Sequence, residues 1–258
     1  MMALTRPTDR RPPRPETLFH YTCSESCFEI IRTSKLWASS AFCTNDATEI
    51  EYGVRLVQNV AKEYLSDNEL ARINPYIRSW LAEICVACFS APPADQLSQW
   101  RAYAKNGAGY AIGLRTTLLE QAGRKMAFDL VPVIYNRKQQ RSELRKLFED
   151  NRPTDMSNSA RIMLKAVRRA LSFKNASFRE ENEWRLVSAR PLGRPPPFQY
   201  RATRWGVMPY VEIPFDRDSI NEVWLGPALD HKLTERTLEM FIRHCASKVR
   251  PPRQEVRG

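Results

Sequence analysis

Two carboxylates that lie close together in the chain, Glu181 and Glu183, are the strongest candidates for catalysis. They precede an apolar run that predicts a strand over residues 183–188. If the extended geometry begins at Glu181, both side chains project to the same side, because side chains alternate along a strand. Paired carboxylates can divide the chemistry, one stabilising a developing positive charge and the other accepting a proton. The structural alternative is that Glu183 pairs with Arg185 or Arg179 on the sheet surface.

A second candidate is His20, one of only three histidines in the chain. It lies in residues 18–22, which predict a short strand, followed by a helix over 24–33 and a further strand at 36–38. A histidine on such a strand can direct a ring nitrogen into a cleft. Used structurally, the same side chain would bond to a backbone carbonyl in the core. The pattern leaves both roles open.

A predicted helical turn over residues 96–103 has two different faces. Leu97 and Trp100 would lie on the face that packs into the core. Ser98 and Arg101 share the opposite face, where they could contact a ligand.

Metal chemistry has weaker support in the sequence. Asp46, Glu49 and Glu183 could hydrolyse a nucleic-acid or nucleotide phosphate with Mg²⁺, but only if the fold brings them together. Asp46 and Glu49 also fit the first turn of a helix, and capping is the simpler explanation for them. Cys85 and Cys88 stand three apart on a predicted strand, where they face opposite ways and cannot share one zinc ion. No metal is therefore expected, and the chain contains no P-loop, dinucleotide glycine motif, H-E-x-x-H or G-x-S-x-G.

Composition and charge bound the class of protein. The chain has 258 residues, of which 43% are hydrophobic and 27% charged, enough for one core of ordinary globular type. No apolar run approaches the roughly 18 residues that a membrane span requires, and a cytoplasmic protein without a membrane partner is expected. The net charge of +11 favours a polyanionic partner.

The domain organisation follows from the distribution of apolar residues. Residues 1–16 form a basic, proline-rich tail without hydrophobic periodicity, which predicts disorder or loose docking. A single α+β domain of catalytic type is expected over residues 17–250, with a second tail at 251–258.

Basic residues recur at helical spacing in the predicted helix over residues 157–173, where they would form a cationic stripe: Arg161, Lys165, Arg168 and Arg169. Arg201 and Arg204 follow in a predicted loop that also contains prolines and aromatic residues. Arginines among aromatic side chains suit phosphate contact and base stacking, which points to nucleic acid. The alternative is a solvated helix face beside an irregular loop.

The remaining pattern predicts an antiparallel or mixed sheet with inserted helices, because strands adjoin strands without a repeating strand-helix-strand order. Further strands are predicted at residues 84–90, 110–114, 129–135, 210–215 and 220–225. Further helices are predicted from about residue 46 to 65 and at 67–81, 138–149 and 232–246.

Several of these segments resemble, in their order along the chain, a bacterial family catalogued as domain of unknown function 2971. The matching segments are residues 18–22, 36–38, 45–49, 97–103, 109–114, 178–187 and 223–227. The family name itself implies no activity.

The opening of the chain also resembles, more distantly, that of the ADP-ribosyltransferases. This resemblance implies a split antiparallel sheet whose first strand carries a histidine and whose late strand carries a catalytic glutamate. Glu183 would be that glutamate, and Glu181 would belong to an E-x-E motif found in some members. The usual middle-strand motif has no clear counterpart in this chain.

The same resemblance implies a binding site for NAD, which would be a substrate. His20 would hydrogen-bond the adenine-side ribose, supported by Thr22, and Tyr103 or Trp100 would pack near the nicotinamide. The residues expected to contact the nucleotide are His20, Tyr21, Thr22, Asn45, Ser98, Trp100, Arg101 and Tyr103.

The sequence and these resemblances together favour an NAD-dependent ADP-ribosyltransferase-like enzyme that modifies nucleic acid or a nucleic-acid-associated protein. A toxin or phage-defence effector, neutralised by an antitoxin or regulatory protein, would fit this chemistry. The alternatives are a non-catalytic module that binds nucleic acid and a metal-dependent nuclease or phosphodiesterase.

Overall fold

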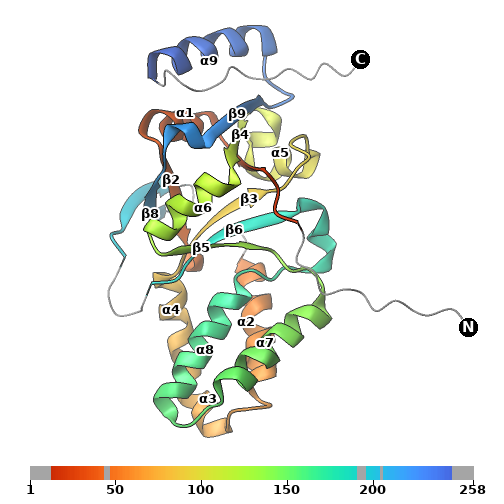
Figure 1. The fold of residues 1–258 in the computed structure, drawn as a ribbon, viewed down its shortest axis with the longest axis vertical. Helices are drawn as coiled ribbons and strands as arrows, with labels where there is room; N and C mark the ends of the chain where they lie inside the picture. The colour runs from red at the N-terminus through yellow and green to blue at the C-terminus, as the bar shows by residue number, and fades with distance from the viewer. Residues whose placement is uncertain (1–12, 44–46, 191–195, 204–205, 246–258) are drawn as a thin grey trace, which may run out of the picture.

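The computed structural model describes residues 13–43, 47–190, 196–203 and 206–245, which form one antiparallel sheet between helical layers (Figure 1). The strands are β1 (Thr17–Thr22), β2 (Lys35–Ser40), β3 (Cys85–Ser90), β4 (Tyr110–Arg115), β5 (Phe128–Pro132), β6 (Glu183–Ser188), β7 (Gln199–Thr203), β8 (Gly206–Pro214) and β9 (Ile220–Leu225). The helices are α1 (Ser24–Thr33), α2 (Ala47–Ala61), α3 (Asp67–Ile73), α4 (Ile77–Glu83), α5 (Leu97–Tyr103), α6 (Thr116–Lys125), α7 (Arg137–Asn151), α8 (Met156–Ala170) and α9 (His231–Cys245). The α+β class predicted from the sequence is confirmed.

The sheet divides into two branches at β3. One edge of β3 pairs along its length with β6, which in turn pairs with β5. The opposite edge is shared, because Val86 pairs with Ser39 of β2 whereas Ser90 pairs with Phe19 of β1. One branch continues through β2, β8 and β7, and the other through β1, β4 and β9. Between Val86 and Ser90, the carbonyl oxygen of Cys88 accepts a hydrogen bond from the His20 side chain.

Helices cover both faces of the sheet. A lower layer of α2, α3, α4, α7 and α8 packs beneath β3 and β6, where Val86 and Val187 join its apolar core (Figure 1). The other face, with Ala87 and Leu186, packs against α1, α6 and α9. Because side chains alternate, successive residues of β3 and β6 belong to different cores. No helix of the described residues is long and apolar enough to cross a bilayer.

The structure differs from the predicted secondary structure in three places. The helix expected over residues 67–81 is divided into α3, a 3₁₀ turn (Asn74–Tyr76) and α4, because Pro75 cannot donate the hydrogen bond that a continuous helix needs. The helix α6 was not predicted. It approaches β6 closely at Gly123, where a Cβ would lie 2.6 Å from the Leu186 side chain. The segment containing Arg201 is the edge strand β7 and not a loop, since it pairs with β8.

The predicted tails lie mostly outside the described residues. The last residues before the domain do contact it, because Arg14 pairs with Glu120 of α6 and the Glu16 carbonyl accepts a hydrogen bond from Thr116.

Candidate functional site

A cavity of about 390 Å³ lies where the two branches of the sheet separate, and we call it the branch cavity. His20 of β1 and Glu183 of β6 both line it, so the two residues singled out in the sequence share one cavity. Tyr21, Thr22 and Tyr103 also contribute to its wall. A smaller cavity of about 50 Å³ adjoins it, with His20 and Glu183 in its lining again and Glu181 added.

Part of the cavity wall belongs to a buried ionic cluster of three carboxylates and two cations, which we call the five-residue cluster: Glu49, Lys174, Glu181, Glu183 and Arg185. Lys174 Nζ lies 2.6 Å from Glu181 Oε2 and 3.1 Å from Glu183 Oε2. Arg185 donates twice to Glu183, from Nε to Oε1 at 2.7 Å and from Nη2 to Oε2 at 2.8 Å. Glu49 of α2 pairs with both cations. With all five groups ionised, the cluster keeps one net negative charge.

Strand alternation brings Glu183 and Arg185 together, because both project from β6 toward the lower helices. Glu181 reaches the cluster differently from the way the sequence predicts. It ends a 3₁₀ turn (Ala176–Glu181), and Asn182 then takes a left-handed conformation with φ 43° before β6 begins. Extended geometry therefore begins at Glu183 and not at Glu181, yet the two carboxylates still meet, through Lys174.

The environments of the two carboxylates push their pKa values apart. Burial alone would raise the pKa of Glu183, but the charge and hydrogen bonds of Arg185, together with Lys174, lower it to about 2. Burial raises the pKa of Glu181 above its ordinary value, although the hydrogen bond from Lys174 opposes the shift. Glu183 is thus a fixed negative charge, whereas Glu181 is the stronger base.

A hydrogen bond to the backbone of β3 holds His20 in one tautomer. Its Nδ1 lies 2.9 Å from the carbonyl oxygen of Cys88. A carbonyl can only accept, so Nδ1 carries the proton. Burial lowers the pKa of His20, against the opposing hydrogen bond to Cys88, and keeps the ring neutral. Nε2 consequently offers a lone pair to a hydroxyl group, and no described residue forms a hydrogen bond to it. The structural and ligand-binding roles considered from the sequence are both compatible with this geometry.

The lowered pKa of His20 predicts a loss of stability in acid. Protonation is more difficult in the folded state, so the contribution of the neutral ring is complete above pH 6.5, the ordinary value, and is lost as the pH falls toward the lower folded-state pKa. Unfolding in urea at several pH values should show this loss in the wild type. His20→Gln should show a smaller loss between pH 6.5 and 5, and an identical pH dependence of the two proteins would contradict the prediction.

Comparison with known proteins finds a similarity over part of the chain. Residues 99–186 match the family model described as Protein of unknown function (DUF2971). This part of the chain resembles DUF2971. The matched segment includes Tyr103 and four members of the five-residue cluster, whereas His20 and Glu49 lie outside it. No curated protein and no solved structure matches the chain. The similarity predicted from the sequence is supported, over a shorter range than the one expected.

Not every residue expected at the nucleotide site reaches the branch cavity. Trp100 is 1% exposed and packs edge-on against Tyr21, at 4.9 Å between ring centres. Ser98 and Arg101 line a separate surface pocket. Leu97, expected in the core, is 58% exposed because α5 buries little besides its Trp100 side. Asn45 lies outside the described residues.

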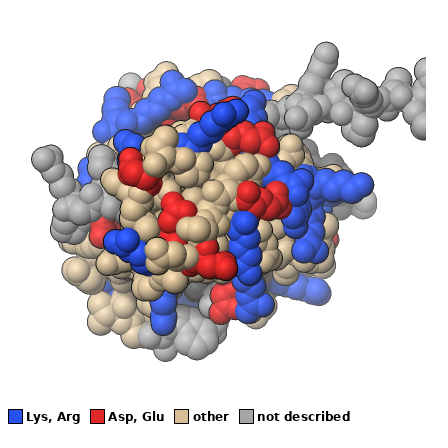
Figure 2. Space-filling model, turned by 90° about the horizontal axis from the view of Figure 1, so that it is seen from below, with Lys and Arg blue, Asp and Glu red and all other residues tan. Residues whose placement is uncertain are grey.

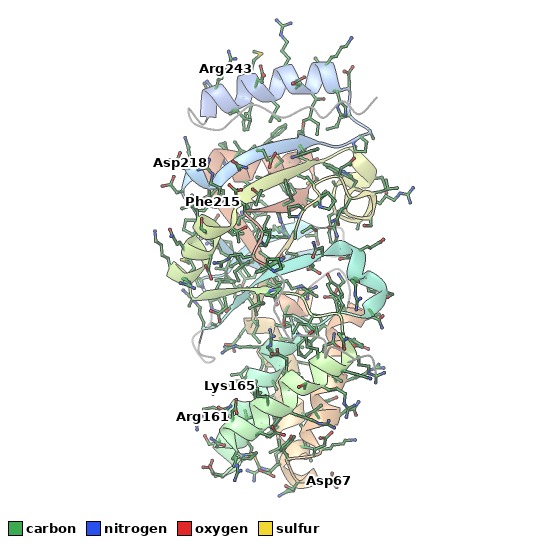
Figure 3. All side chains as sticks on the ribbon, turned by 45° about the vertical axis from the view of Figure 1, so that its right-hand side comes forward. Asp67, Arg161, Lys165, Phe215, Asp218 and Arg243 are labelled. Atoms are coloured by element: carbon green, nitrogen blue, oxygen red, sulfur yellow. The ribbon has the colours of Figure 1, made fainter. Side chains whose placement is uncertain are left out.

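The basic residues of α8, also within the DUF2971 segment, do not form one continuous cationic face. Arg161 and Lys165 point outward from the lower layer (Figure 3). Arg168 donates to a backbone carbonyl, and Arg169 pairs with Glu143 at 2.9 Å. Seen from below, basic and acidic side chains are interspersed (Figure 2). Two of the four basic residues are thus engaged within the protein, Arg168 with the segment after β6 and Arg169 with α7.

Arg201 and Arg204, grouped with that stripe in the sequence, also separate from it. Arg201 lines the branch cavity from the edge strand β7. Arg204 lies outside the described residues.

Two of the three acidic residues considered for a metal are paired with cationic side chains. Glu49 and Glu183 do lie together, but Arg185 bonds to both of them and Lys174 approaches both at 3.1 Å. Asp46 lies outside the described residues. Among those that are described, no group of three or more His, Cys, Asp or Glu side chains could hold a metal ion.

Sequence reasoning missed Lys174, the residue that joins the carboxylates. It is 2% exposed and follows the apolar end of α8. A single lysine directly after Leu171, Ser172 and Phe173 was the available signal, because a cation at the end of a buried segment requires a partner.

Proposed function

We propose that this protein is an NAD-dependent ADP-ribosyltransferase-like enzyme whose reaction takes place in the branch cavity. The observation that carries the proposal is that His20 and Glu183 line one cavity at the division of the sheet. The distant resemblance stated from the sequence requires such a pair. A shared cavity is not a trivial outcome, since 163 positions separate the two residues in the chain.

The five-residue cluster supports this chemistry through its charge. Cleavage of NAD breaks the bond between the ribose C1′ and the nicotinamide nitrogen, and nicotinamide leaves with the bonding electron pair. Positive charge then develops on the ribose as an oxocarbenium ion. Glu183 remains ionised with its pKa at about 2, and the net negative charge beside it would stabilise that ion.

Glu181 supplies the second part of the proposed reaction. An acceptor hydroxyl, amine or water attacks C1′ and must lose a proton. The raised pKa of Glu181 makes it the better proton acceptor of the pair, and it lines the smaller cavity beside Glu183. The neutral His20 ring would accept a hydrogen bond at Nε2 from a ribose hydroxyl and hold the substrate in place.

The net charge of +11 supports a polyanionic acceptor, nucleic acid or a protein bound to it, for the ADP-ribose group. A toxin or phage-defence effector that an antitoxin or regulatory protein restrains would use such an acceptor. These assignments concern the acceptor and the biological setting and are separate from the cleavage of NAD.

The experiment that tests the proposal incubates the purified protein with labelled NAD and, in parallel, RNA, DNA or cell lysate. Chromatography measures nicotinamide release, and electrophoresis measures label transfer. We expect nicotinamide release with label on one class of acceptor. Absence of both products with every acceptor would overturn the proposal, whereas release without transfer would reduce it to NAD hydrolysis.

A further inference from the structure

The guanidinium of Arg201 occupies an unusual position at the wall of the branch cavity. Its Cζ lies 5.4 Å from the centre of the Trp37 ring and 5.8 Å from that of Tyr210, and these two rings are themselves 4.9 Å apart. Nη2 donates to Ser39 Oγ at 3.0 Å. Neutral groups from β2 and β8 thus fix the direction of a positive charge.

No carboxylate of the described residues pairs with Arg201, and its buried Nε has no hydrogen-bond partner. Arg185, which lines the same cavity, differs in this respect because Glu183 and Glu49 neutralise it. Burial lowers the pKa of Arg201, which reflects the cost of a cation without a counter-ion. Such a cost is tolerated where an anionic ligand supplies the missing counter-charge to the guanidinium.

The two ends of the cavity therefore differ in charge. The five-residue cluster carries a net negative charge at one part of the wall, and Arg201 carries an unpaired positive charge at another. An anion would be repelled by the first and attracted by the second. A planar guanidinium held on aromatic rings matches the oxygen atoms of a phosphate, which it can bind with two parallel hydrogen bonds.

We propose that Arg201 binds a phosphate group of a nucleotide in the branch cavity and so directs the uncharged or cationic end of that ligand toward Glu183. This inference deepens the proposed function and rests on it for the identity of the substrate. The binding of phosphate at Arg201 rests on the geometry of the cavity alone and can be measured without catalysis.

The test is calorimetric titration with ADP-ribose, inorganic pyrophosphate and adenosine, for the wild type and Arg201→Gln. The matched control is Arg78→Gln, because Arg78 also lies over an aromatic ring, Phe42, at 5.3 Å, but outside the cavity. We expect at least a tenfold loss of ADP-ribose affinity in Arg201→Gln, unchanged affinity in Arg78→Gln, and competition by pyrophosphate. Adenosine, which has no phosphate, should bind both variants like the wild type.

Equal ADP-ribose affinity in Arg201→Gln and the wild type would overturn the inference, as would a wild type that binds neither ADP-ribose nor pyrophosphate. If Arg201→Gln does not fold, modification of the wild type by phenylglyoxal replaces it: pyrophosphate should protect Arg201 and leave Arg78 reactive.

Failure of the proposed function is a separate result. A protein that releases no nicotinamide but binds ADP-ribose through Arg201 retains the inference, and Arg201→Gln with normal KM for NAD excludes it.

Discussion

Replacing Glu183 by glutamine is expected to slow nicotinamide release at least a hundredfold. Loss of a preorganised group that stabilises transition-state charge costs about 3 kcal/mol. Glutamine keeps the size of the side chain but removes the charge, which the pKa of about 2 keeps in place throughout the working pH range. The measurement is kcat for NAD cleavage. Glu212→Gln is the matched control. Glu212 also pairs with a cation, because its Oε2 lies 2.6 Å from Lys35 Nζ, but neither residue lines the branch cavity.

Glu183 also holds Arg185 and Lys174, so a loss of activity has to be separated from a loss of structure. Circular dichroism and the thermal midpoint of each variant provide that separation. Glu49→Gln provides a comparison, because it removes a carboxylate from the same two cations. Glu49 comes from α2 and not from β6. If both variants fold and lose activity equally, the cluster acts as a unit. Wild-type activity in folded Glu183→Gln would exclude Glu183 from the chemistry.

Replacing Arg185 by methionine is expected to destabilise the fold by about 3–5 kcal/mol, because removing one partner leaves buried charge without compensation. Arg185 is 4% exposed, and its loss would leave Glu183 and Glu49 with Lys174 as their shared cation. Urea unfolding measures the change. Arg55→Met is the control: Arg55 pairs with Glu51 at the exposed surface, where such a pair contributes at most about 1 kcal/mol.

A double variant distinguishes unpaired charge from lost packing. Arg185→Met combined with Glu183→Gln removes one charge of each sign, so it should recover part of the stability that the single variant loses. Additive losses in the double variant would show that the guanidinium acts through packing and not through its charge.

Local patterns in the sequence were sufficient for much of the fold. The strand β6 begins and ends where the alternation of Glu183 to Ser188 predicts, and α1 follows the apolar spacing of residues 24–33. The edge strand β7 could not be recognised, because its polar residues acquire strand geometry only by pairing with β8. Long-range pairing of this kind leaves no periodic signal in the segment itself.

The site divides in the same way between sequence and tertiary structure. By itself the sequence determined the residue types: a histidine on the first strand, two carboxylates before a late strand, and a surplus of positive charge. Only the tertiary structure decided which of them meet. Glu49, Lys174 and Glu181 come from a helix and two connecting segments, and burial forces them to pair because isolated charges in an apolar interior are too costly. The same constraint bears on Arg201, which is half-buried and whose buried Nε has no hydrogen-bond partner among the described residues.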